Sequence, residues 1–443
     1  MNLNRKKLYL ASVSLLLGGF SSLQCGAQDL LTVLHQAQKH DSQWAATVHG
    51  YHANRELVTK SSAGIKPTLS LNAQVSQETY ESATDTYESN NYESTRYGAS
   101  LVQPLIRMEQ WYDYKKGKAL NRQIKADFKF SRQDFYMRVL TIYLDVLRTE
   151  ENLRFRLAEK SAIKHQLDQT ELRFKANLIS NTDVQEAKAA FDISSVQYII
   201  AQQDLDVALE VLNTLTGSNS TTVTPLEVEI PIEPPSPKNL KTWRELALNN
   251  NPQLRAARHG QEVAQKEYQA KLSAHLPTLD LVGSYQDSDR YVQTSEGELT
   301  SSSIAIKLEV PLYNGGSIGA SRRNAKQLFK KAEDEFIFKQ REILQDTNNL
   351  YRVVNTDVAR VMAQKQSAHS VEAALNATQA GYKAGTRTIV DVLTAQQALF
   401  GVKRDYANAR FDYIFDLLQL KQIAGILSEK DFVEVNGWLA KGE

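Results

Sequence analysis

The stretch GYKAGTRTIVDVLTAQQALF, residues 381–400, reads as the end of one helix followed by the start of another. Gly385 marks the break, because glycine readily adopts the left-handed backbone that ends many helices. A phenol, a cation and a carboxylate stand close to it in the chain, namely Tyr382, Arg387 and Asp391. The stretch therefore predicts a helix–helix junction that carries a polar cluster.

The same pattern occurs earlier, in RFKANLISNTDVQEAKAAF at residues 173–191. Four positions correspond at a separation of 208 residues: Phe174 with Tyr382, Lys175 with Lys383, Ala176 with Ala384, and Asp183 with Asp391. Upstream, KPTLSLNAQVS at 66–76 matches LPTLDLVGSYQ at 276–286, and Gly217 matches Gly425. The nearly constant offset indicates one duplicated unit of about 200 residues rather than two unrelated domains.

The N-terminus has the pattern of a secretory signal peptide. Basic residues at 5–7 precede an apolar run at 8–20 and a small-residue cleavage site ending at Ala27. We expect residues 1–27 to be removed, and with them Cys25, the one cysteine of the chain. The alternative is lipidation of Cys25, although Gln24 stands where such sites want a small residue. After cleavage no disulfide can form, so stability must come from packing.

Composition excludes some classes of protein. The chain has 52 basic and 51 acidic residues, and this balance predicts no nucleic-acid partner. After the signal, no apolar run reaches the ~20 residues of a transmembrane helix. A membrane form of the mature chain would therefore have to be a β-barrel.

Proline marks the layout of the helices, because proline disrupts a helix interior. Residues 105–224 and 312–443 contain none, and the segment from Met108 to Lys175 could run ~100 Å as one helix. Apolar residues at steps of three and four predict supercoiled packing. This seam comprises Val184, Ala187, Phe191, Ser194, Tyr198, Ala201, Leu205, Ala208, Leu212 and Leu215, and then Val392, Ala395, Leu399, Val402, Tyr406, Ala409 and Tyr413.

Alternation of apolar and polar residues predicts two pairs of strands, at about 68–80 with 92–105 and about 278–291 with 299–311. The second of these strands, near Tyr97, has the weakest pattern. The polar stretches within each pair look like water-exposed hairpin loops. The expected units are a signal peptide at 1–27, repeats at 28–217 and 243–427, a linker at 218–242 and a C-terminal tail at 428–443.

Four strands with one apolar and one wet face fit a barrel between lipid and water, but they cannot close a barrel alone. An open edge in lipid leaves backbone groups unpaired, so several protomers are required. The alternative is a coiled-coil surface or periplasmic binding protein without a pore. That protein would be soluble without detergent, whereas a channel would need it.

The chain resembles the TolC-like outer-membrane efflux and secretion channels over essentially its whole mature length. The motifs are HLPTLDL at 275–281, VPLYNGG at 310–316, the stretch at 173–192, and above all AGYKAGTRTIVDVLTAQQALFGVKRDYANARFDYI at 380–414. The resemblance implies an α+β homotrimer in the outer membrane. Each protomer would give four strands to a 12-stranded barrel and long helices to a periplasmic tunnel, with the linker and tail as a belt around its middle.

The same resemblance implies a passive duct for multidrug efflux, type I protein secretion or both. A periplasmic adaptor would connect it to an inner-membrane transporter of the RND or ABC type. The periplasmic end would be closed by polar links, in which Arg387 reaches Thr182 and Asp183, and Tyr382 reaches Gln166. The cargo does not follow from the sequence, because a duct need not recognise what passes through it.

Two further features follow from the resemblance. Asp391 would form a threefold carboxylate ring at the constriction, as charged rings do in other pores. Relatives often have a second carboxylate one helical turn after the first, where this chain has Thr394. We therefore expect weaker selectivity for cations and less block by multivalent cations. The junctions at Asn177 and Gly385 would receive adaptor tips, and asparagine in place of the common glycine would narrow the choice of adaptor.

Signals for other chemistry are weak. NGGSIG at 314–319 lacks the spacing of a phosphate-binding loop and is better explained as a turn between a strand and a helix. His49 and His52 lie three apart, but no third metal ligand is evident. No nucleophile, base and orienting group occur together, so we expect no enzyme activity and no cofactor.

Overall fold

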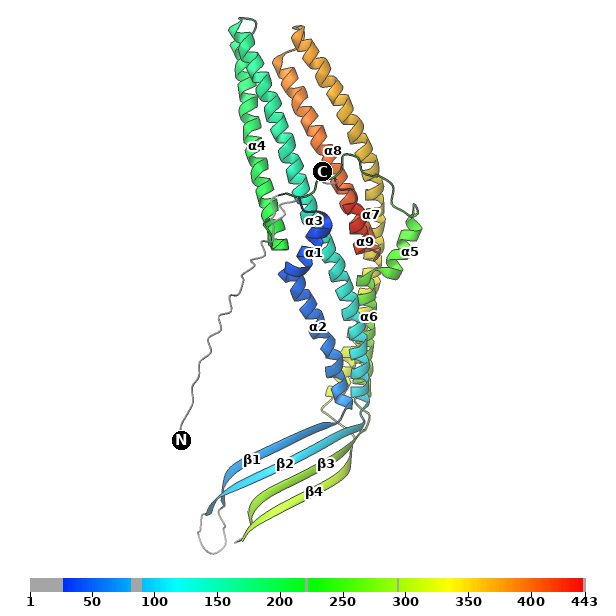
Figure 1. Cartoon of the computed structure of the whole chain (residues 1–443). Coiled ribbons are helices and arrows are strands. Elements are labelled where there is room, and N and C mark those ends of the chain that lie inside the picture. Colours follow the sequence, from blue (N-terminus) through cyan, green and yellow to red (C-terminus); the bar gives the residue numbers. More distant parts are fainter. Residues whose placement is uncertain (1–26, 81–89, 220–221, 293–294, 441–443) are drawn as a thin grey trace, which may run out of the picture.

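The computed structural model describes residues 27–80, 90–219, 222–292 and 295–440. The predicted signal peptide, including Cys25, lies outside these residues except for Ala27. The molecule is long and narrow, with a sheet at one end and helices over the rest of its length (Figure 1). Among the described residues, no helix contains a segment long and apolar enough to cross a membrane.

The element order repeats once along the chain. The first set is α1 (Leu30–His40), α2 (Ser42–Ser62), a 3-10 turn (Ala63–Ile65), β1 (Thr68–Tyr80), β2 (Asn90–Ile106), α3 (Met108–Lys175) and α4 (Asn181–Thr216). The second is α5 (Leu240–Asn250), α6 (Pro252–Ser273), β3 (Thr278–Val292), β4 (Ser295–Glu309), α7 (Ser317–Lys383) and α8 (Ile389–Ile423), followed by α9 (Glu429–Asn436). The duplicated α+β unit is thereby confirmed, and Met108–Lys175 is one helix as predicted.

The four strands form one antiparallel sheet in the order β1-β2-β3-β4, so β1 and β4 are its edges. Ala73 pairs with Tyr97, Ala99 with Tyr285 and Gly283 with Ile304. Most large apolar residues of the strands are exposed in the single chain, whereas Leu279 and Leu281 of β3 are half-buried. The exposed fractions include 72% for Leu69, 81% for Leu71, 85% for Ile304 and 68% for Ile306.

The predicted boundaries of β4 were wrong. We expected residues 299–311, but the strand covers Ser295–Glu309. Glu298 pairs with Asp289 and Thr300 with Asp287, so most of the polar stretch that looked like a loop is paired strand. Polar side chains do not prevent pairing, because the ladder is made by backbone groups. β2 likewise starts two residues earlier than expected, at Asn90.

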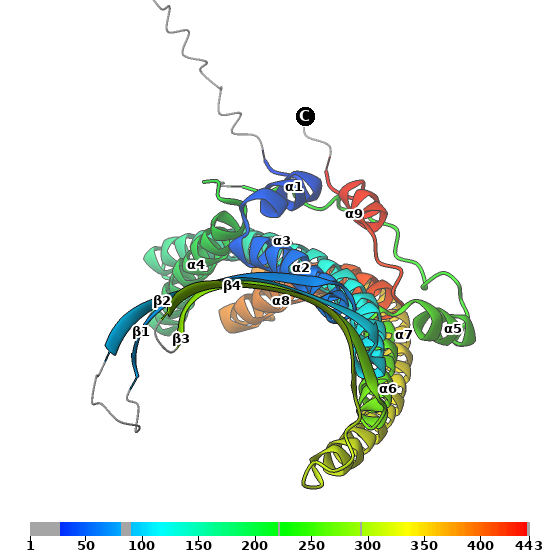
Figure 2. The same cartoon turned by 90° about the horizontal axis from the view of Figure 1, so that it is seen from below.

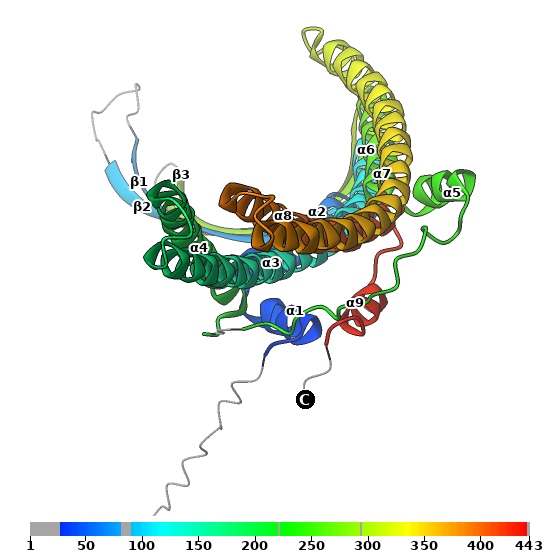
Figure 3. The same ribbon diagram turned by 90° about the horizontal axis from the view of Figure 1, so that it is seen from above.

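The long helices α3 and α7 run from the sheet to the far end, about 100 Å for 68 and 67 residues. The shorter helices α4 and α8 return beside them (Figure 1). Seen along the long axis, the sheet and the helices curve together into an arc (Figures 2 and 3). α1, α9 and the linker lie on its convex side.

The linker is held to the helices by buried aromatic side chains. The Trp243 indole is fully buried and donates a hydrogen bond to the Pro237 carbonyl at 2.8 Å. The Tyr143 and Tyr413 hydroxyls donate to the carbonyls of Thr224 and Glu233, both at 2.9 Å. The two ends of the described chain join this region as well: Leu226 bridges to Leu439, and Gln28 bridges to Val223. α4 ends at Thr216 and α5 starts at Leu240, so the linker expected at 218–242 overlaps the first residues of α5.

Candidate functional site

Two helix junctions lie side by side at the end of the molecule opposite the sheet (Figure 1). Asn177 has φ of 57° and Gly385 has φ of 78°, so both take the left-handed backbone that the sequence predicted. In each junction the peptide N–H closes back on the preceding helix, from Leu178 to Arg173 at 3.0 Å and from Thr386 to Gly381 at 2.9 Å. These bonds satisfy carbonyls at the helix end.

The returning helices begin with equivalent caps. Asp391 accepts hydrogen bonds from the Thr388 N–H at 2.8 Å and the Thr388 hydroxyl at 2.9 Å, and Asp183 accepts the same pair from Ser180 at 3.0 and 2.9 Å. The bonds from Thr388 lower the pKa of Asp391. Sequence reasoning missed this capping role, although the spacing Thr-x-x-Asp and Ser-x-x-Asp was readable.

Tyr382 packs at a small cluster that joins the two junctions. The cluster contains Ile163, Leu167, Ala187, Ala190, Ile389 and Leu393, with Phe191 and Tyr382 against it. The Arg173 guanidinium lies 4.7 Å from the centre of the Tyr382 ring, a cation–π distance. The structure therefore packs Tyr382 against α3, the helix that carries Gln166.

The predicted link between Tyr382 and Gln166 is not formed in the single chain. The Tyr382 hydroxyl and the Gln166 Nε2 are both buried, and neither has a hydrogen-bond partner among the described residues. Buried polar groups of this kind are uncommon and costly. Two such groups next to one apolar cluster mark a place where a small side-chain movement or a neighbouring subunit can supply the missing bonds.

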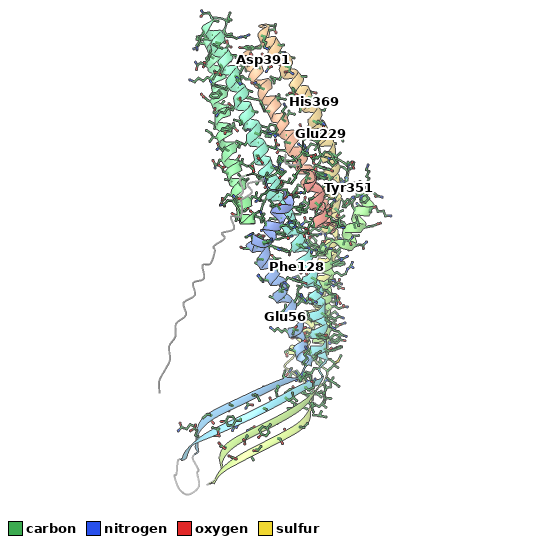
Figure 4. The ribbon with its side chains drawn as sticks, viewed as in Figure 1. Glu56, Phe128, Glu229, Tyr351, His369 and Asp391 are labelled. Atoms are coloured by element: carbon green, nitrogen blue, oxygen red, sulfur yellow. The ribbon has the colours of Figure 1, made fainter. Side chains whose placement is uncertain are left out.

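Arg387 also makes no hydrogen bond or ion pair with Thr182 or Asp183 within the described residues. Its Cγ lies only 2.8 Å from where a Cβ on Gly381 would be, so its stem covers the last turn of α7. Thr394 is exposed, one turn beyond Asp391 on α8, and Figure 4 shows Asp391 near the end of that helix.

The described residues contain no group of three or more His, Cys, Asp or Glu side chains that could hold a metal. The NGGSIG stretch joins a turn to a helix: Gly315 and Gly316 have φ of 58° and 81°, and α7 begins at Ser317.

The comparison with known families decides the class of the protein. The model of the outer membrane efflux protein family matches residues 33–218 and 243–426, the greater part of both repeats. The chain belongs to this family. Its members are transport channels of the outer membrane, so the protein is an outer-membrane exit duct whose helices form a large periplasmic part.

Similar proteins in this family include the outer membrane protein TolC of Vibrio cholerae, 32% identical over 98% of this chain and 99% of that protein. TolC of Escherichia coli is 30% identical over 98% and 90%. The alkaline protease secretion protein AprF of Pseudomonas aeruginosa is 29% identical over 94% and 88%.

Solved structures share the fold. The VceC protein of Vibrio cholerae has a TM-score of 0.77 at 15% identity, covering 89% of this chain and 96% of that one. The CmeC channel of Campylobacter jejuni has a TM-score of 0.76 at 15% identity, covering 99% and 98%.

Proposed function

We propose that three copies of this outer membrane efflux protein close a 12-stranded barrel, which continues into a periplasmic helical tunnel. The sheet carries this proposal, because both of its edges are open and its apolar side chains are exposed. Backbone groups at an edge must be paired in lipid. Pairing β1 of one copy with β4 of the next meets this requirement and leaves the apolar residues against outer-membrane lipid.

In this arrangement the duct is passive. An inner-membrane RND or ABC-type transporter supplies the energy, and a periplasmic adaptor joins it to the tunnel. The relatives differ in cargo: AprF and PrtF of Dickeya chrysanthemi are protease secretion proteins, and CzcC of Cupriavidus metallidurans is a cobalt-zinc-cadmium resistance protein. The proposal therefore includes efflux and type I secretion.

Planar-bilayer recording of the purified protein tests this function. We expect extraction from outer membranes only with detergent, a trimeric mass in detergent, and discrete conductance steps after insertion. A chain that stays soluble without detergent and inserts no pores would instead support the coiled-coil binding protein.

The junctions serve as the gate in this proposal. Tyr382 and Gln166 supply one polar link, and Arg387 with Thr182 and Asp183 supplies another, within a protomer or between neighbours. The unpartnered Tyr382 hydroxyl and Gln166 amide support it, since closing the link would satisfy both groups.

Asp391 forms the proposed carboxylate ring, and Thr394 leaves the next turn uncharged. We expect Thr394→Asp to lower the concentration of a trivalent cation needed for half block about tenfold, which corresponds to ~1.4 kcal/mol. The reason is that three added carboxylates would face the same narrow space. Thr394→Asn, of similar size but uncharged, is the control. Equal cation block of both variants would contradict a position of residue 394 at the pore constriction.

Adaptor docking at the two junctions is the remaining part of the proposal. Asn177 holds a left-handed backbone that glycine would adopt without a side chain. We expect Asn177→Gly to strengthen binding of adaptor hairpins that normally meet glycine at both junctions, as measured by affinity for a panel of hairpins. The reciprocal Gly385→Asn variant should bind fewer of the hairpins in the panel. Unchanged preference in both variants would count against docking here.

A further inference from the structure

A cluster of carboxyl groups lies between α7 and α8, away from the junctions. Asp357 comes from α7, and Asp412 and Asp416 come from α8. Asp357 is only 3% exposed, and its Oδ2 is buried without a protein hydrogen-bond donor in the described part of the chain. Asp416 lies one helical turn beyond Asp412 on the same face of α8, with its side chain within hydrogen-bonding reach of Asp357. Two ionised carboxylates cannot make such a bond, because neither has a hydrogen to donate.

The arginines around the cluster are engaged mainly by the third carboxylate. Arg360 Nη2 lies 2.8 Å from Asp412 Oδ2 and 3.1 Å from Asp357 Oδ1. Arg148 Nη2, from α3, lies 2.9 Å from Asp412 Oδ1. None of the ion pairs found among the described residues reaches Asp416. The charged groups facing the pair are thus Asp412, Arg360 and Arg148, and they leave one negative charge of the three aspartates uncompensated.

We propose that Asp357 and Asp416 bind one proton between them, and that this shared proton ties α7 to α8 beneath the linker. When it is bound, one carboxyl donates a hydrogen bond to the other, and three carboxylates no longer compete for two arginines. When it is lost, two adjacent anions repel each other across the helix pair.

The titration of the pair agrees with this geometry. Burial, with the bond to Asp357, raises the pKa of Asp416 to about 7. Burial also raises the pKa of Asp357, although Arg360 opposes the rise. In the unfolded chain these groups ionise near the ordinary value of 3.8. The folded protein therefore holds the extra proton between about pH 4 and pH 7, and stability falls as pH rises through this window.

The pair of Asp357 and Asp416 lies near the linker, on the two helices that lead to the junction at Gly385. Tyr413, next to Asp412 on α8, donates its hydroxyl hydrogen bond to Glu233 of the linker. The same two helices end at the junction that contains Gly385. Loss of the proton would loosen the α7–α8 pair at the level of the linker, so the helices could separate more readily above pH 7 than at pH 5.

Infrared titration of the detergent-solubilised full-length protein tests the site. We expect the wild type to show a protonated-carboxyl band that disappears with a midpoint near pH 7, and Asp416→Asn to lack it. The asparagine amide can still donate to Asp357, so the contact between the helices is retained. Asp405→Asn is the matched control, because Asp405 lies on α8 with its side chain 50% exposed.

Thermal unfolding gives a second measurement. The wild-type Tm should fall between pH 5 and pH 8, and Asp416→Asn should lose most of that fall while Asp405→Asn keeps it. If Asp416→Asn fails to fold, Asp357→Asn carries the same expectation. The proposal is overturned if the wild type has no carboxyl band titrating between pH 5 and pH 8, or if the band survives in the asparagine variant.

Discussion

Replacing Tyr382 by phenylalanine and Arg387 by serine in one chain is expected to raise single-channel conductance several-fold. The change removes both polar links of the proposed gate. Exposed ion pairs are worth ~0–1 kcal/mol each, so three copies of the proposed Arg387 link would hold the end closed by at most ~3 kcal/mol. A standard protein–protein interface can exceed this amount, which is why adaptor docking could open the same gate. Planar-bilayer recording beside the wild type measures the effect.

The matched control is Tyr382→Phe with Lys383→Ser. It removes the same hydroxyl and one positive charge from the same helix end, but leaves Arg387 in place. Low conductance in the control and high conductance in the test variant would assign the difference to Arg387. If the test variant conducts like the wild type, the protein is still a channel, but Tyr382 and Arg387 do not form its gate.

Replacing Gly425 by alanine is expected to destabilise the protein more than the same change at Gly385 does. Gly425 has φ of 71° at the end of α8, and its first-copy counterpart Gly217 has φ of 67°. A methyl group at Gly425 would overlap the carbonyl of Asn250 and lie 2.6 Å from the backbone nitrogen of Asn251. Left-handed strain of ~1–2 kcal/mol would add to overpacking of ~1–3 kcal/mol.

Gly385→Ala separates these two costs. Gly385 has φ of 78°, but an added methyl group would meet nothing within 4 Å. We therefore expect a loss of only ~1–2 kcal/mol, the cost of the backbone strain. Thermal unfolding of both variants in the same detergent measures the difference. Equal losses would show that the segment joining α5 and α6 moves away at no cost.

Local patterns were sufficient for much of the fold. The absence of proline and the spacing of apolar residues predicted α3 as one helix from Met108 to Lys175, as the structure shows. The period of two predicted four strands, and the repeat predicted their equivalence. These features are readable because backbone conformation and one-sided burial both repeat at short, regular intervals.

The predictions that failed or stayed open concern polar residues. The start of β4 was misplaced because pairing depends on the facing strand, not on the polarity of Ser295 or Glu298. Asp391 was assigned to a pore ring without its bonds to Thr388. The Thr-x-x-Asp spacing indicates that cap, whereas the resemblance implies a place in a pore ring. The ring and the polar links are proposals.

Residue identities along the chain were enough to predict a duplicated α+β protein with two helix breaks, since helix periodicity, strand alternation and repeats are all local or periodic properties. The channel function followed from the resemblance of its motifs to a known family. Contacts between distant segments were needed for the rest. The unpartnered Tyr382 hydroxyl and Gln166 amide, and the carboxyl pair of Asp357 and Asp416, appear only when α3, α7 and α8 are packed together. Burial and charge balance at these groups depend on what faces them, and no spacing in the sequence encodes that.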